Sequence, residues 1–186
     1  MEITKTLYVI SRAEWREWLQ ENYKSEPEIW LVVYHKAAGQ PSLAYNAAVE
    51  EALCFGWIDS IRKNLDSERY VQRFSPRRRG RGYSQTNKER LRKLIEQGRV
   101  LPEVLMTIDM DEIEAYEFPA DIMAALQANP RAWENFQRYE ASYQRIRVAY
   151  IEARRDRVEE FEKRLEHFMR KTEQDKQFGY DIEAYY

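Results

Sequence analysis

The feature that most constrains this chain is a run of seven uncharged residues, Ile29 to His35, in a sequence where 33% of the residues are charged. The run reads IWLVVYH, and β-branched and aromatic residues of this kind are favoured in strands. A strand that lacks polar alternation is typical of a position inside a sheet, where both faces are buried. The chain is therefore predicted to build a sheet around this run.

Two segments of alternating polar and apolar residues predict a β-hairpin in the same sheet. They run from Trp57 to Lys63 and from Arg69 to Pro76, and residues 64–68 form the loop between them. Pairing the last residue of the first segment with the first residue of the second places Asp59 opposite Arg73. This register predicts a cross-strand ion pair between Asp59 and Arg73 that is at least partly buried.

Helical periodicity covers most of the remaining chain. Ser11 is followed three residues later by Glu14, a capping box that predicts a helix over residues 12–22. Helical spacing returns at Ser84 and dominates to residue 171. A small, mostly antiparallel sheet with helices in the N-terminal part, followed by a helical C-terminal subdomain, makes this an α+β protein. We expect an α+β subdomain at residues 1–106, an acidic connector at 107–117, a helical module at 118–174 and a loosely attached tail at 175–186.

The charges are distributed unevenly along the chain. The net charge is −2, yet residues 61–100 carry 13 Lys and Arg against 4 Asp and Glu. The segments on either side are acidic. The basic middle can attract a phosphate or another acidic group, whereas the acidic flanks repel a long polyanion and disfavour nucleic acid as a partner.

Several classes of protein are excluded by what the sequence contains. The longest stretch without a charge, residues 37–49, has 13 residues, too few for a membrane-spanning helix. The N-terminal residues lack an export signal, so we expect a cytoplasmic protein. One cysteine and two histidines exclude zinc fingers, and the phosphate-cradling and metal-binding motifs are missing. We expect neither a metal nor a cofactor.

Several blocks of sequence carry a resemblance to a known family. They are ALCFGWIDS at residues 52–60, RYVQRFSPRR at 69–78, YSQTNKERLRKLIEQGR at 83–99, FPADIMAALQANPRAWENF at 118–136 and YIEARR at 150–155. In order and spacing they resemble the YdeI/OmpD-associated family, also labelled bacteriocin-protection proteins. The chain departs from the family's usual pattern at Tyr83, where the family has Trp. The resemblance implies a cytoplasmic bacterial protein linked to stress or antimicrobial tolerance, with no established catalytic activity or cofactor.

The candidate site residues each have a structural interpretation beside the functional one. Cys54 is a buried small hydrophobe or a nucleophile, although neither histidine is placed by its spacing to serve as its base. Asp59 is half of a structural ion pair or half of a ligand-binding pair, and a role as general acid would need a second carboxylate or a cleft. Asn87 is an amide that locks the fold or one that recognises a ligand. The arginines of residues 77–81 are a solvated surface or, beside the start of the Ser84 helix, an anion site.

The leading interpretation is a non-enzymatic binding or regulatory protein that holds a small anionic ligand, or an acidic peptide of a partner protein. The predicted ligand-binding residues are Trp57, Asp59, Arg73, Arg77, Arg81, Tyr83, Ser84 and Asn87. An enzyme that uses the same pocket, with Asp59 as acid or base, is the alternative. Weak nucleic-acid binding through the arginine loop is a third interpretation, since aromatic residues interleave with the arginines.

Overall fold

The computed structural model describes residues 2–78, 80 and 82–179 of the chain. Contacts between Cα atoms divide it into two compact units, each built from two pieces of chain. The sheet unit comprises residues 1–82 and 90–109, and the helical unit comprises residues 83–89 and 110–186. The sequence-based division at residues 106, 117 and 174 stays a prediction.

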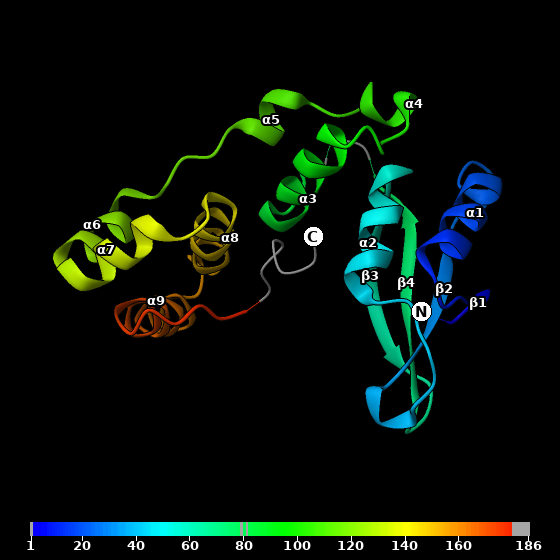
Figure 1. Ribbon diagram of the computed structural model, residues 1–186, viewed down its shortest axis with the longest axis horizontal. Coiled ribbons are helices and arrows are strands. Elements are labelled where there is room, and N and C mark those ends of the chain that lie inside the picture. Colours follow the sequence, from blue (N-terminus) through cyan, green and yellow to red (C-terminus); the bar gives the residue numbers. More distant parts are fainter. Residues whose placement is uncertain (1, 79, 81, 180–186) are drawn as a thin grey trace. The chain divides into compact units, whose positions relative to one another are not determined.

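Four strands in the described part of the sheet unit form one mixed sheet (Figure 1). The strands are β1 (Thr6–Tyr8), β2 (Ile29–Tyr34), β3 (Trp57–Asn64) and β4 (Arg69–Pro76). Their order is β1-β2-β4-β3, with β1 and β2 parallel and the other two pairs antiparallel. The α+β class and the mostly antiparallel sheet are confirmed. The first three residues of β2 are buried, as expected for a strand inside a sheet.

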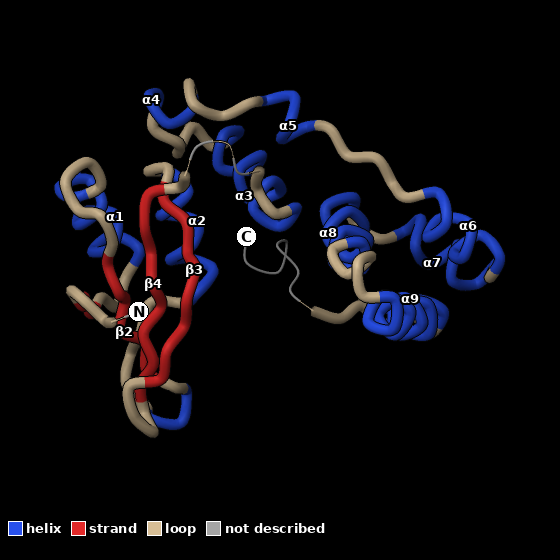
Figure 2. Tube along the Cα trace, turned by 180° about the vertical axis from the view of Figure 1, so that it is seen from behind, coloured by secondary structure: helices blue, strands red, loops and turns tan. Residues whose placement is uncertain are grey.

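Two helices cover one face of this sheet (Figures 1 and 2). The helices of the sheet unit are α1 (Arg12–Asn22), a short 3-10 helix (Lys36–Ala38), α2 (Tyr45–Cys54) and α4 (Pro102–Leu105). The predicted capping box begins α1, because the Ser11 hydroxyl accepts the Glu14 amide hydrogen at 3.2 Å. Trp15 of α1 is fully buried, donates its indole N–H to Ala48 O of α2 at 3.0 Å and packs on Phe74 of β4. One tryptophan thus ties both helices to the sheet.

The hairpin forms where the sequence predicts it, but its register is different. The Asp66 carboxylate accepts the amide hydrogens of Arg69 at 2.8 Å and of the preceding residue at 2.9 Å, which closes a tighter loop than predicted. An irregularity in β3 between Asp59 and residue 62 shifts the pairing again. Asp59 consequently lies opposite Phe74. The predicted pairing of Asp59 with Arg73 is wrong, because shifting a strand by one residue exchanges the faces on which its side chains lie.

The helix α3 (Gln85–Glu96) contributes to both units. Glu89, in the helical-unit part, is 3% exposed and accepts both arms of the Arg145 guanidinium at 2.7 Å each. The next residue, Arg90, is also buried and donates to Asn46 Oδ1 at 2.8 Å inside the sheet unit. Consecutive residues of one helix are therefore anchored in different units.

The helical unit is a cluster of helices around an aromatic core. Its remaining helices are α5 (Met110–Glu114), α6 (Ala120–Ala128), α7 (Pro130–Arg138), α8 (Ala141–Glu152) and α9 (Val158–Glu173). Asn129 and Pro130 begin α7 as predicted, since Asn129 Oδ1 accepts the Ala132 amide hydrogen at 3.1 Å. The buried core consists of Ile122, Leu126, Ala132, Phe136, Tyr139, Tyr143, Val148, Ile151 and Phe168.

The segment after α9 is attached to this core. Phe178 packs against the core cluster, and Tyr143 Oη accepts the Phe178 amide hydrogen at 3.0 Å. Gly179 follows with a left-handed φ of 79°. The sequence predicts a loose end from residue 175, yet Phe178 makes these contacts with the core. Residues 180–186 lie outside the described part of the chain.

Replacing Gly179 with alanine is expected to detach this segment. The left-handed conformation alone costs an alanine about 1–2 kcal/mol, and the new Cβ would lie 2.8 Å from Arg147 Cζ. Trypsin should then cut after Lys176 at least about ten times faster than in the unchanged chain, because local detachment exposes the bond. Gly98→Ala is the matched control, since Gly98 has a φ of 65° and nothing lies within 4 Å of its Cβ position. Equal cleavage of the two variants would contradict the expectation.

Candidate functional site

Trp57, the first predicted ligand residue, is part of the core of the sheet unit. It is 1% exposed, and its indole N–H donates to Tyr23 O at 3.1 Å. Its ring meets the Trp18 ring edge-on at 5.8 Å. Both the apolar body and the polar atom of this side chain are used inside the fold, which is the ordinary behaviour of a buried tryptophan.

Asp59 is partly exposed and accepts hydrogen bonds from two neutral side chains. The Tyr45 hydroxyl donates to Asp59 Oδ2 at 2.7 Å, and Gln72 Nε2 lies 3.4 Å from the same oxygen. The predicted ion pair with Arg73 is replaced by this arrangement because Gln72 and Asp59 share a face of the hairpin. The carboxylate thus acts as a hydrogen-bond acceptor in a small polar cluster.

Arg73 forms its ion pair with Glu28 instead. Arg73 Nε donates to Glu28 Oε2 at 2.7 Å, and Arg73 Nη1 donates to the hydroxyls of Ser60 and Ser75 at 3.1 and 3.2 Å. A hydrogen bond from the Thr4 hydroxyl, together with Arg73 and against the opposing effect of burial, lowers the pKa of Glu28. Arg73 is therefore a structural residue with satisfied donors on the other face of the hairpin from Asp59.

The predicted residues at the start of α3 belong to the helical unit. Ser84 caps the helix, because its hydroxyl lies 3.4 Å from the Asn87 amide nitrogen, and Asn87 is 5% exposed. The carboxylate of Glu112 accepts the Tyr83 amide hydrogen at 3.2 Å. An acidic side chain of the protein thus already lies at this helix start, where the amide groups and the helix dipole favour a negative charge.

The arginine loop is only partly described. The Arg77 amide donates to Gly56 O at 2.9 Å, which joins the end of β4 to the turn before β3. Arg81 lies outside the described residues. The eight predicted residues are distributed over the two units, and their role as one ligand site stays a prediction.

Cys54, the remaining candidate, is fully buried at the end of α2. Burial, together with the nearby negative charge of Glu51, raises the pKa of its thiol to about 11. A neutral buried thiol is a poor nucleophile because the thiolate is the reactive form. The interpretation of Cys54 as a buried small hydrophobe is confirmed.

The raised pKa predicts how Cys54 responds to pH. At pH 8 an ordinary thiol with a pKa near 8.5 is about one quarter thiolate, so native Cys54 should react with a disulfide reagent at least about 100-fold more slowly than the denatured chain. The neutral thiol stabilises the fold fully below pH ~8.5, and this contribution is lost as the pH rises towards 11. Reaction rates measured by absorbance at pH 8, with and without denaturant, check this. Equal rates in a chain that remains folded would contradict it.

A cluster of five charged residues, not predicted from the sequence, is the most developed polar site of the sheet unit. Glu50 and Glu51 of α2 are each 1% exposed. Arg12 donates to Glu50 at 2.5 Å and lies 3.4 Å from Glu51, and Arg16 donates to Glu51 at 2.8 Å. Arg99 also donates to Glu51. One buried carboxylate thus receives three guanidinium groups, which we call the arginine triad (Arg12, Arg16 and Arg99).

The arginine triad carries more charge than the carboxylates beneath it. Three guanidiniums face two carboxylates, which leaves one positive charge in excess. The carboxylates are buried, whereas the side chains of Arg12, Arg16 and Arg99 are 37, 31 and 28% exposed. Arg16 is held further by the carbonyl of Arg99 at 3.3 Å and by the Phe55 ring at 5.2 Å. The arrangement can therefore present fixed N–H donors and a net positive charge to solvent.

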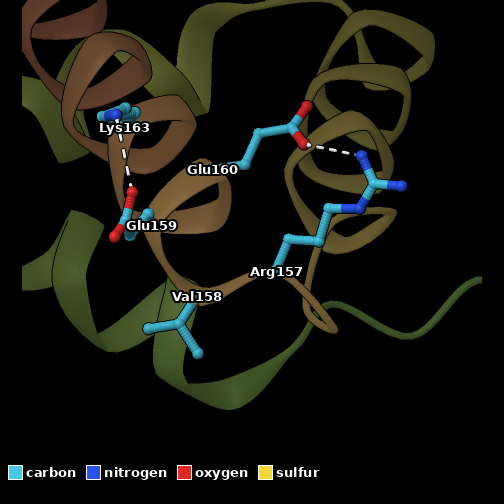
Figure 3. Close-up of a pocket in the computed structure, with 5 residues that line it drawn as sticks. All are labelled: Arg157, Val158, Glu159, Glu160 and Lys163. Carbon is cyan, nitrogen blue, oxygen red and sulfur yellow. Dashed lines mark ion pairs between the residues drawn. The ribbon is translucent and has the colours of Figure 1, made fainter.

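A surface depression of about 440 Å³ lies at the start of α9 in the helical unit (Figure 3). Arg157 pairs with Glu160 at 3.5 Å, and Lys163 lies 3.9 Å from Glu159. Val158, which also lines the depression, is 64% exposed. Charges of both signs are paired within this depression, so it has no excess charge to select an ion.

The described residues contain neither a metal-binding cluster nor a membrane-spanning helix. No three His, Cys, Asp or Glu side chains in the described ranges are grouped so that they could hold a metal ion. Among the helices that the structure describes, none has the length and apolar character required to span a membrane.

Two protein families match parts of this chain, whereas no curated protein and no solved structure matches it. Residues 115–175 match the family described as Bacteriocin-protection, YdeI or OmpD-Associated, which confirms for this part the resemblance seen in the sequence. Residues 7–107 match the family described as Domain of unknown function (DUF8412). The segment at residues 115–175, which follows the DUF8412 match, is the part that matches the YdeI/OmpD-associated family. Because the DUF8412 match spans more than half of the 186 residues, the chain belongs to the DUF8412 family.

Proposed function

We propose that this chain is a non-enzymatic binding protein and that its sheet unit takes a small anionic ligand at the arginine triad. The observation that supports this best is the excess of charge, with three guanidiniums held around two buried carboxylates. A carboxylate, sulfate or phosphate group is the expected ligand chemistry. Guanidinium groups bind these planar or tetrahedral oxyanions through paired N–H donors.

The carboxylates fix the arginines before any ligand arrives. A free arginine side chain loses about 2 kcal/mol of rotamer entropy when it is held in one position. In the triad this cost is already met within the fold, because each arginine has a buried carboxylate as partner. The described hydrogen bonds of the three arginines use their terminal Nη atoms. We therefore propose that the Nε–H groups donate to the anion.

The start of α3 supports this location over the one predicted from the sequence. Glu112 lies against the Tyr83 amide at that helix start and also pairs with Lys88 at 3.5 Å. An incoming anion would have to displace or approach this carboxylate. The arginine triad repels an anion less, because the positive charge of its three arginines exceeds the negative charge of the two carboxylates.

Phosphate titration tests the proposal. In the full chain, the Nε–H resonances of Arg12, Arg16 and Arg99 should shift with inorganic phosphate or sulfate and stay unchanged with chloride at equal ionic strength. A ten-nucleotide strand should bind no more tightly than phosphate. Tighter binding of the strand, with a steep dependence on salt, would favour the nucleic-acid interpretation. Shifts confined to residues around Asp59 would instead favour the interpretation as an enzyme with Asp59 as acid or base.

Arg99→Gln is the variant that separates binding from folding. It removes the excess charge and leaves Glu51 paired with Arg12 and Arg16, so the sheet unit should remain folded. Losing one charge-assisted hydrogen bond of ~1.5–3 kcal/mol should weaken phosphate binding about ten-fold or more. Arg155→Gln is the matched control, since Arg155 pairs with Glu152 and Asp121 in the helical unit. Unchanged phosphate affinity in a folded Arg99→Gln chain contradicts the proposal.

A role in antimicrobial tolerance is part of the same proposal. The description of the family that matches residues 115–175 names bacteriocin protection. We extend this role to the chain, with the anion site as the functional element. A sensitive bacterium that expresses the chain should survive a higher bacteriocin concentration than the same strain expressing Arg99→Gln at an equal level. If the two strains survived equally, and both better than a strain with an empty vector, protection would not depend on the arginine triad.

A further inference from the structure

The residues after α9 bind to the helical unit in the manner of a recognised peptide. The hydroxyl of Tyr143 accepts the Phe178 amide hydrogen at 3.0 Å and lies 3.3 Å from Phe178 O. One side chain on α8 therefore meets both main-chain groups of a single residue. Main-chain contacts of this kind hold an extended segment whatever its side chains are.

The Phe178 side chain provides the selectivity. Its ring meets the His167 ring edge-on at 4.7 Å and lies 6.4 Å from the Phe168 ring. Arg147 Cζ lies 5.7 Å from the centroid of the Phe178 ring, a cation–π contact. Arg147 is 7% exposed and also lies over Tyr143 and Tyr150. An aromatic side chain in this site therefore contacts two other aromatic rings and a buried cation.

Gly179 extends this selectivity by one residue. Its φ of 79° is a conformation that residues with a side chain rarely adopt. A Cβ at this position would lie 2.8 Å from Arg147 Cζ, so the guanidinium of Arg147 would have to move. The site therefore accepts an aromatic residue that is followed directly by glycine.

We propose that this surface is a docking site for a peptide segment of a partner protein that carries an aromatic residue followed by glycine. The chain's own Phe178-Gly179 occupies the site in the structure. The residues between α9 and Phe178 are exposed, and the Asp175–Arg138 pair among them has side chains 52 and 57% exposed. Within residues 174–179 the contacts with the aromatic core are made through Phe178, so a competing segment has to replace the contacts of this residue.

The covalent connection sets how strongly a partner must bind. A segment joined to its site by a few residues acts at an effective concentration in the millimolar range. A peptide added to the unchanged chain must compete with this internal copy. Removing the internal aromatic ring should therefore expose the full affinity of the site.

The test uses the full-length Phe178→Ala chain and a labelled, end-capped peptide with the sequence QDKQFG of residues 174–179. The peptide should bind this variant at least ten-fold more tightly than the unchanged chain, as measured by fluorescence anisotropy. A peptide with alanine in place of phenylalanine should not bind. Lys176→Ala is the matched control chain, because Lys176 is exposed and its loss leaves the internal Phe178 in place.

A second variant that empties the site controls for misfolding of Phe178→Ala. Gly179→Ala keeps the phenylalanine but displaces the segment, so it should bind the peptide as Phe178→Ala does. In both variants the ring resonances of Tyr143 and His167 should shift when the peptide is added. Failure of the peptide to bind either chain while the helical unit remains folded overturns the proposal. Equal binding to the unchanged chain overturns it too, since the peptide would then lie elsewhere.

Discussion

Replacing Glu51 with glutamine is expected to destabilise the sheet unit by about 3 kcal/mol. The change removes the carboxylate that receives all three guanidiniums of the arginine triad, while the shape of the side chain is kept. Removing one partner of a buried ion pair costs about 3–5 kcal/mol, because the remaining charges lose their compensation. The lower end applies here, since the arginines are about one third exposed and can be hydrated again.

Urea unfolding followed by tryptophan fluorescence measures this loss. Trp15, Trp18, Trp30 and Trp57 all lie in the sheet unit and report on it. Glu103→Gln is the control, because Glu103 pairs with Lys24 at 2.7 Å but its side chain is 47% exposed. Its loss should leave the urea midpoint nearly unchanged. If the two variants had the same midpoint, Glu51 would not hold the triad in the way the distances imply.

Replacing Trp57 with alanine is expected to cost about 4 kcal/mol of stability, because removing a buried aromatic side chain leaves a cavity. Trp57 is 1% exposed, and its ring packs against the Trp18 ring. Alanine also leaves Tyr23 O without the indole donor that lies 3.1 Å away. The sequence predicts Trp57 as a ligand residue, and this result would assign it a structural role.

Two variants of Trp57 separate packing from hydrogen bonding. Trp57→Phe keeps an aromatic ring and removes the N–H donor, so it should cost about 1–3 kcal/mol, less than Trp57→Ala. Phosphate affinity measured below the unfolding transition should stay the same in Trp57→Phe. A large loss of phosphate affinity in a folded Trp57→Phe chain would return Trp57 to the ligand site.

The elements of the sheet unit could be predicted because their signals are local. Each of these signals identifies one element: the uncharged run at residues 29–35, the capping box at Ser11 and the two alternating hairpin segments. The register of the hairpin could not be predicted in the same way. It depends on the side chain of Asp66 and on an irregularity after Asp59, and a shift of one residue changes which face every side chain occupies.

The arginine triad was missed because its members are far apart in the sequence. Arg12 and Glu50 are 38 residues apart, and Arg99 and Glu51 are 48 apart. One signal was available: residues 45–54 form a helix whose only charges are Glu50 and Glu51. Two adjacent carboxylates on an otherwise uncharged helix indicate that this helix is buried and that cations from elsewhere meet it.

The contacts of Phe178 had no such signal. The sequence around it has no helical or alternating period, so it reads as a loose end. Its attachment depends on Tyr143, which precedes it by 35 residues and supplies both main-chain partners. A tertiary contact that depends on single side chains rather than on a repeated pattern leaves no periodic trace in a sequence.

The shared helix α3 affects how the chain can be dissected and in what order it can fold during synthesis. Residues 83–89 belong to the helical unit but are followed by residues 90–109 of the sheet unit. A ribosome therefore has to synthesise the first piece of the second unit before the first unit is complete. No single cut of the chain yields either unit whole. A fragment ending at residue 82 lacks Arg99 and leaves Glu51 with two of its three guanidiniums, and one starting at residue 110 lacks Glu89, the carboxylate that pairs with Arg145.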